Sequence, residues 1–188
     1  MKVAIFGGSF NPPHIGHVMA ATYAMSIGKL DHVLVVPVYQ HAFDKELAPF
    51  EDRCDMCELA MCRNFRGIEV SRIESKLETP NRMLRTLTKI KELHPHWELR
   101  LLMGTDVQEE TDKWLAFDEV KKLAEPFVVG REGHDKVTSS KVRILPEISS
   151  TQIREWLNNR TDPVALTHLG RVLPARVLKY INAHELYL

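Results

Sequence analysis

Residues 3–17, VAIFGGSFNPPHIGH, carry the clearest structural pattern of this chain. Its first four residues are apolar, and Gly7 and Gly8 end the run, which predicts a buried strand leading into a loop. From residue 16 to about residue 27, small and apolar residues recur at helical spacing, and Gly28 offers a stop. The segment therefore predicts a strand, a loop and a helix in direct succession.

The same alternation continues along the chain, which implies βαβ units with right-handed crossovers. We therefore expect an α/β fold with a doubly wound parallel sheet, in one domain that spans residues 1–188. Ligands of such sheets bind at the carboxyl ends of strands, where Gly7, Pro37 and Gly104 fall. Further strands are expected at 32–38, 67–73, 98–104, 126–130 and 142–146, and helices at 51–64, 80–94 (opened by Thr79 or Pro80), 116–124 and through the C-terminal third.

The charge balance limits the classes of partner. The 25 basic and 25 acidic residues cancel, so no global field attracts a polyanion such as DNA or an anionic membrane surface. Binding of phosphate must therefore be local, and we expect neither nucleic acid nor membrane as a partner. The N-terminal apolar run is too short for a signal peptide or a membrane span, so the expected location is cytoplasmic.

Three cysteines, Cys54, Cys57 and Cys62, are clustered. An odd, clustered set does not suit a secreted disulfide framework, so free thiols are expected. Cys54 and Cys57 form a C-x-x-C pair, but no second pair stands at the distance of a zinc site. Core thiols are the better interpretation than a metal site.

The loop after the first strand has the properties of an anion cradle. Glycines allow close approach of the backbone to a phosphate, and the N-terminus of the next helix presents unpaired N–H groups. The segment lacks both the G-x-G-x-x-G spacing of a dinucleotide fold and the G-K-[ST] ending of a P-loop. Instead His14 and His17 are three residues apart, so both imidazoles can face the cradle and donate to phosphate oxygens. Helix capping or core packing is the alternative role for this pair.

A second segment, ISSTQIR at 148–154, suits a polyphosphate. Its Ser149, Ser150 and Thr151 are candidate N-caps for a helix beginning near Gln152, with Arg154 in the first turn. A helix N-terminus together with a guanidinium group favours phosphate binding. Capping alone is the alternative role.

GGSFNPPHIGH, residues 7–17, resembles the H-x-G-H signature of the nucleotidylyltransferase superfamily, specifically that of the nicotinate mononucleotide adenylyltransferases. ISSTQIR resembles the I-S-S-T-x-x-R motif of the same family. The similarity also includes LLMGTD at 101–106 and VLPARVLKYINAHELY at 172–187, so it spans nearly the whole chain. The resemblance implies a Rossmann-like nucleotidyltransferase fold.

The resemblance also implies the reaction: the phosphate of nicotinate mononucleotide attacks the α-phosphorus of ATP, and deamido-NAD and pyrophosphate are formed. Mg²⁺ would accompany ATP and neutralise phosphate charge, and no residue is assigned as a metal ligand. His14 and His17 are the expected catalytic residues. The expected ATP-binding residues are Gly7, Gly8, Ser9, Phe10, Gly104, Asp106, Ile148, Ser149, Ser150, Thr151 and Arg154.

Three residues are expected at the acceptor. Lys45 lies in the loop that approaches the acceptor in the family, and Trp114 stands where relatives have a stacking tryptophan. Arg82 stands where bacterial relatives carry a tyrosine, and it offers a partner for the nicotinate carboxylate. The alternatives are that Lys45 is solvated, that Trp114 is part of the core and that Arg82 faces solvent. Nicotinate is preferred to nicotinamide as the acceptor, but the choice between acid and amide stays open at this point.

Two other functions compete with this one. One is a transferase of the same fold that uses another phosphorylated acceptor, such as phosphopantetheine, and the other is a non-catalytic sensor of ATP or NAD. GGSFNPPH favours the pyridine acceptor over phosphopantetheine, and the two histidines argue against a sensor. The expected partners are ATP and a pyridine mononucleotide, with a homo-oligomer left open.

Overall fold

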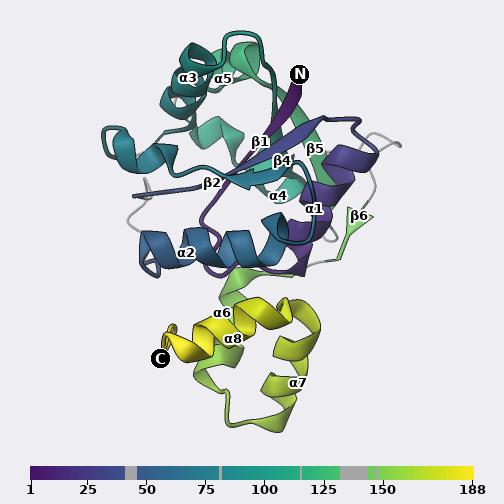
Figure 1. The fold of residues 1–188 in the computed structure, drawn as a ribbon, viewed down its shortest axis with the longest axis vertical. Helices are drawn as coiled ribbons and strands as arrows, with labels where there is room; N and C mark the ends of the chain where they lie inside the picture. The colour runs from purple at the N-terminus through teal and green to yellow at the C-terminus, as the bar shows by residue number, and fades with distance from the viewer. Residues whose placement is uncertain (41–45, 81, 115, 132–143, 147) are drawn as a thin grey trace.

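A parallel sheet forms the centre of the molecule. The computed structural model describes residues 1–40, 46–80, 82–114, 116–131, 144–146 and 148–188. Six strands pair in parallel in the order β3-β2-β1-β4-β5-β6 (Figure 1), which confirms the predicted doubly wound sheet. The strand order reverses between β1 and β4, and ligands of such folds bind at that point. The strands are β1 (Lys2–Gly8), β2 (His32–Pro37), β3 (Ile68–Val70), β4 (Glu98–Gly104), β5 (Glu125–Arg131) and β6 (Ile144–Leu145).

Helices cover both faces of the sheet. In Figure 1, α3 and α5 lie on one side of the sheet, α1 and α2 lie on the other, and α6, α7 and α8 form a group beyond them. Within the described part of the chain, no helix has the length and apolarity to cross a membrane. The α-helices are α1 (Ile15–Ser26), α2 (Phe50–Cys57), α3 (Met83–Leu93), α4 (Thr105–Glu109), α5 (Phe117–Leu123), α6 (Ser150–Asn158), α7 (Pro163–Val172) and α8 (Ala175–Ala183).

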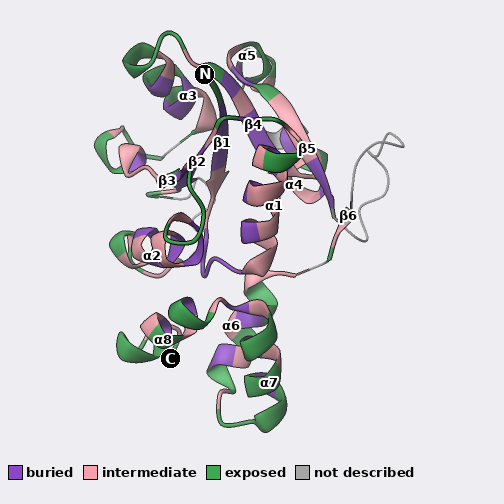
Figure 2. Cartoon of the chain, turned by 45° about the vertical axis from the view of Figure 1, so that its right-hand side comes forward, coloured by how far each residue is buried: buried purple, intermediate pink, exposed green. Residues whose placement is uncertain are grey.

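The strand residues alternate between two cores. Ala4 and Phe6 of β1 face the core that α1 shares with the C-terminal helices, whereas Val3 and Ile5 face the core under α3 and α5. Figure 2 shows the buried strands through the middle of the molecule. Burial on both faces explains why β1 is continuously apolar. The first core continues from the sheet into α6, α7 and α8, as one domain requires, and the single-domain assignment stays a prediction.

Helix α3 begins later than the sequence predicts. Its first residue is Met83, and Arg82 is an extended N-cap with φ −132° and ψ 136°. The predicted start at Thr79 or Pro80 was therefore wrong. The first turn is fixed by a tertiary contact, because the Thr86 hydroxyl donates to a Glu74 carboxylate oxygen at 2.8 Å.

Other boundaries also differ. The predicted helix at 51–64 is an α-helix that becomes a π-helix over Glu58–Cys62. The predicted last strand at 142–146 is observed at Ile144–Leu145, and residues 142 and 143 lie outside the described residues. The other predicted strands and helices of the sheet region are present with ends that differ by up to three residues.

The three cysteines are free thiols, as predicted. Cys54 and Cys57 are fully buried, and burial raises the thiol pKa of Cys54 to about 12 and that of Cys57 well above its usual range. Burial also raises the pKa of Cys62 to about 11. Because the thiolate is the nucleophile, we expect no thiol to react with Ellman's reagent at pH 8 in the native protein, and all three to react in denaturant. Fast labelling of the native protein would contradict this burial.

Candidate functional site

The loop between β1 and α1 is held in a strained shape. A Cβ added to Gly7 would collide with Met83, and one added to Gly8 would lie 3.2 Å from the Phe10 ring. Phe10 itself has φ 47°, in the left-handed region, which costs about 1–3 kcal/mol. Its buried ring contacts the Phe6 ring edge-on, with centroids 5.3 Å apart, so packing offsets this strain.

The two histidines lie together at the start of α1. Their ring centroids are 3.9 Å apart, which confirms that both rings are on one side. The backbone N–H of His14 donates to Nδ1 of His17 at 3.1 Å, so a neutral His17 carries its proton on Nε2. His17 lines the cavity described below, whereas His14 is 2% exposed and is not among the lining residues. The two rings therefore have different surroundings, which the sequence did not predict.

The second motif forms the start of α6. The Ser149 side chain accepts a hydrogen bond from the Gln152 N–H at 3.2 Å, so Ser149 is the N-cap. The helix begins at Ser150, two residues earlier than predicted. Arg154 is consequently its fifth residue and not part of its first turn. Its side chain still points back, because Nη2 donates to Thr151 Oγ1 at 3.2 Å.

The tertiary structure brings the two motifs into contact. The Ser150 hydroxyl donates to the Pro12 carbonyl at 3.0 Å. Nη1 of Arg154 donates to the Asn11 carbonyl at 2.8 Å. Ile148 also lies near Gly16, at 3.9 Å from the position of a Cβ there. Residues 7–14, at the end of β1 and before α1, are called the glycine loop below. The start of α6 is attached directly to this loop, although the two are more than 130 residues apart in the chain.

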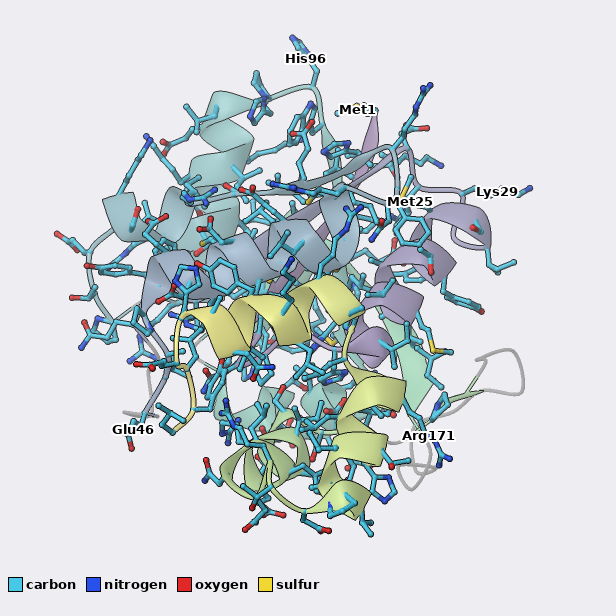
Figure 3. All side chains as sticks on the ribbon, turned by 60° about the horizontal axis from the view of Figure 1, so that its bottom comes forward. Met1, Met25, Lys29, Glu46, His96 and Arg171 are labelled. Carbon is cyan, nitrogen blue, oxygen red and sulfur yellow. The ribbon has the colours of Figure 1, made fainter. Side chains whose placement is uncertain are left out.

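A cavity of about 860 Å³ opens between these segments. Its volume falls within the range usual for small-molecule sites. The histidine, hydroxyl and guanidinium groups around it are suited to phosphate oxygens. Figure 3 shows Glu46 near the end of the yellow C-terminal chain, and both line the cavity. The lining residues are Ser9, Phe10, Asn11, His17, Glu46, Leu47, Ala48, Pro49, Ser150, Thr151, Arg154, Asn158, Glu185, Leu186, Tyr187 and Leu188.

Arg53 supports the glycine loop from behind. Its side chain is 1% exposed, with Nη1 donating to the Ser9 carbonyl at 2.9 Å and Nε to the Ala48 carbonyl at 2.8 Å. Burial lowers the pKa of this guanidinium. Periodicity and motifs along the chain do not predict this role of Arg53. The sequence signal for a buried arginine is its position on the helix face that also carries Cys54 and Met56, which are buried.

Gly104 and Asp106 lie at the same edge of the sheet but outside this cavity. Gly104 ends β4, the neighbour of β1, and Asp106 is in the first turn of α4. Neither residue lines the cavity, and Gly7, Gly8, Ile148 and Ser149 are also not among its lining residues. The ATP-binding roles expected for these residues therefore stay predictions.

Trp114 and Arg82, the two expected acceptor residues within the described ranges, belong to the side of the sheet that α3 and α5 cover. Trp114 is half-buried against the core under α3 and α5, with its ring edge-on to Phe117 at 5.8 Å. Arg82 is exposed at the start of α3. Lys45 lies outside the described residues. The described residues therefore assemble the expected phosphate end of the site but do not join the acceptor residues to it in one cavity.

Comparisons with known proteins agree with one another. The family model described as cytidylyltransferase-like matches residues 5–156. A probable nicotinate-nucleotide adenylyltransferase of Anaeromyxobacter dehalogenans (strain 2CP-C) is 42% identical, covering 99% of this chain and 96% of the relative. Another, of Myxococcus xanthus (strain DK1622), is 36% identical, and the match covers 100% of this chain and 95% of the relative. The structure of the Plasmodium falciparum nicotinic acid mononucleotide adenylyltransferase complexed with NaAD has the same fold, with a TM-score of 0.80 at 23% identity over 99% of this chain and 97% of that one.

Proposed function

Because the chain belongs to the cytidylyltransferase-like family, and within it to the nicotinate-nucleotide adenylyltransferases, we propose that it transfers the adenylyl group of ATP to nicotinate mononucleotide. The products are deamido-NAD and pyrophosphate. The observation that carries the proposal is that His17 and Arg154, from two distant motifs, line one cavity beside the glycine loop. The relatives' names support nicotinate as the acceptor.

In this reaction the acceptor phosphate attacks the α-phosphorus of ATP in line, and pyrophosphate leaves. Nε2–H of His17 donates to a phosphate oxygen on which charge grows during transfer, which lowers the barrier without a covalent intermediate. The N-terminus of α6, together with Arg154, holds the β and γ phosphates. His14 supports the ring of His17 through their contact.

The metal of the reaction is proposed to arrive with ATP. In the described ranges, no group of three or more histidine, cysteine, aspartate or glutamate residues gathers at one point. Mg²⁺ commonly binds through substrate phosphates and water with few protein ligands, and this mode of binding is the one proposed here. Bound there, Mg²⁺ would neutralise the charge of the phosphates.

Arg82 is the residue proposed to distinguish nicotinate from nicotinamide. Its neighbour Met83 packs against Gly7, so the start of α3 borders the end of β1. An exposed guanidinium at this border can pair with the nicotinate carboxylate and offers no charge partner to an amide. A charge-assisted pair contributes about 1.5–3 kcal/mol, which is roughly 10- to 150-fold in kcat/KM.

We expect the wild type to prefer nicotinate mononucleotide by that factor and Arg82→Ala to lose most of the preference. The measurement is kcat/KM for both acceptors with ATP and Mg²⁺, scored by dinucleotide and pyrophosphate formation. Arg85→Ala is the matched control, because Arg85 lies in the first turn of α3, three residues after Arg82, and pairs with Glu78. A preference that survives in Arg82→Ala would remove Arg82 from the acceptor site, and an amide preference in the wild type would correct the acceptor.

The same assay tests the two competing functions. Turnover with phosphopantetheine and not with either pyridine nucleotide would assign the other acceptor class. Binding of ATP with no turnover of any acceptor would assign a sensor. The cytoplasmic location and a homo-oligomeric state stay predictions.

A further inference from the structure

The side chain of Asn11 joins three segments at the glycine loop. Its Oδ1 accepts hydrogen bonds from the Ala48 N–H at 3.0 Å and from the Tyr187 hydroxyl at 2.8 Å. Its Nδ2 donates to the Glu46 carbonyl at 3.3 Å. The Ala48 N–H requires an oxygen and the Glu46 carbonyl requires a donor, so the amide has one orientation that satisfies both. Asn11 is 3% exposed, so these partners enclose its side chain at the wall of the cavity.

The Asn11 carbonyl is bound by a fourth element, because it accepts from Nη1 of Arg154 at 2.8 Å. One residue therefore connects the C-terminal segment to the guanidinium proposed to hold the ATP phosphates. Because the side chain and this carbonyl belong to one residue, the bonds of the Asn11 side chain also restrain the carbonyl that anchors Arg154.

The C-terminal segment is held in an unfavourable conformation that delivers Tyr187 to this residue. Glu185 has φ 51° and Tyr187 has φ 60°, both in the left-handed region. Strain of this kind persists only where surrounding contacts impose it. Arg160 supplies those contacts, because its Nη2 donates to the carbonyls of Leu186 and Tyr187 at 3.0 and 3.1 Å.

The Tyr187 hydroxyl remains a donor throughout the working pH range. Burial raises the pKa of this phenol well above its usual value. Tyr187 and Asn11, which accepts from its hydroxyl, both line the cavity, so this bond belongs to the wall of the site.

We infer that Tyr187 is a positioning residue of the nucleotide site: through Asn11 it holds the loop that carries the anchor of Arg154. The expected change in kcat/KM rests on the proposed adenylyl transfer, whereas the expected change in ATP affinity requires only that ATP binds. Loss of the hydroxyl leaves Asn11 Oδ1 with Ala48 only, so the loop and Arg154 gain freedom that ATP must then remove on binding.

Tyr187→Phe removes this hydroxyl and little else. We expect it to weaken ATP affinity, measured by calorimetry without acceptor, and to lower kcat/KM for ATP, each by about 3- to 10-fold, the size of one hydrogen bond. The KM of the acceptor should stay unchanged. Tyr180→Phe is the matched control: Tyr180 lies on α8, and its hydroxyl donates to Asp52 and Asp55 of α2, away from the cavity.

The route through Asn11 is tested by a double-mutant cycle. If Tyr187 acts through Asn11, the double variant Tyr187→Phe with Asn11→Ala should lose no more ATP affinity than Asn11→Ala alone. Additive losses, unchanged ATP affinity in Tyr187→Phe, or an equal loss in Tyr180→Phe would each overturn the inference. A wild-type protein that binds ATP but turns over no acceptor would refute the proposed function, and the calorimetric comparison would still decide the role of Tyr187.

Discussion

Replacement of His17 by alanine is expected to lower kcat by at least about 100-fold at saturating ATP and acceptor, with little change in the melting temperature. The reason is geometric. Nδ1 of His17 accepts from the His14 N–H, so a neutral ring carries its proton on Nε2, and His17 lines the cavity. A donor aimed at charge that develops during transfer contributes more to kcat than to ground-state binding.

His94→Ala is the control for His17→Ala. His94 is exposed, stacks on Trp97 with centroids 3.7 Å apart, and does not line the cavity, so the same truncation there should leave kcat unchanged. His14→Ala should resemble His17→Ala, because its ring supports the ring of His17. Near-normal kcat in both His14→Ala and His17→Ala would refute the catalytic assignment.

Arg154→Ala is expected to lower kcat/KM for ATP by about 10- to 150-fold, mainly through a higher KM. The guanidinium lines the cavity and is oriented by the Asn11 carbonyl and the Thr151 hydroxyl. Arg154→Lys retains a charge but cannot reproduce the planar fork of donors, so its kcat/KM should fall between those of the wild type and Arg154→Ala.

The measurement is the KM of each substrate at saturating concentrations of the other. Arg171→Ala removes an exposed arginine of α7 that does not line the cavity, and it should change neither KM. If Arg154→Ala altered only the KM of the acceptor, the Arg154 end of the site would have to be assigned to the acceptor and not to ATP.

The parallel sheet, the strand–loop–helix of the first motif and the Ser149 cap of the second were readable from the amino-acid sequence, whereas the first residue of α6 lies two residues before the predicted one. Apolar runs such as residues 3–6 are readable because the period and length of a strand are local properties, and Gly7 and Gly8 end the run by their conformational freedom. The N-cap at Ser149 is local for the same reason. The start of α3 was misplaced, because the contact of Thr86 with Glu74 joins residues that sequence periodicity does not connect.

The residues that support the proposed phosphate end of the site became visible only in the folded chain. Arg53 donates to the Ser9 carbonyl across 44 residues of sequence, and Tyr187 donates to Asn11 across 176. No spacing in the sequence predicts such pairs. The difference between His14 and His17 arose in the same way: one ring is enclosed by packing and the other borders the cavity. Local motifs specify which groups can bind a phosphate, whereas burial and long-range hydrogen bonds specify which of them are held where a phosphate can lie.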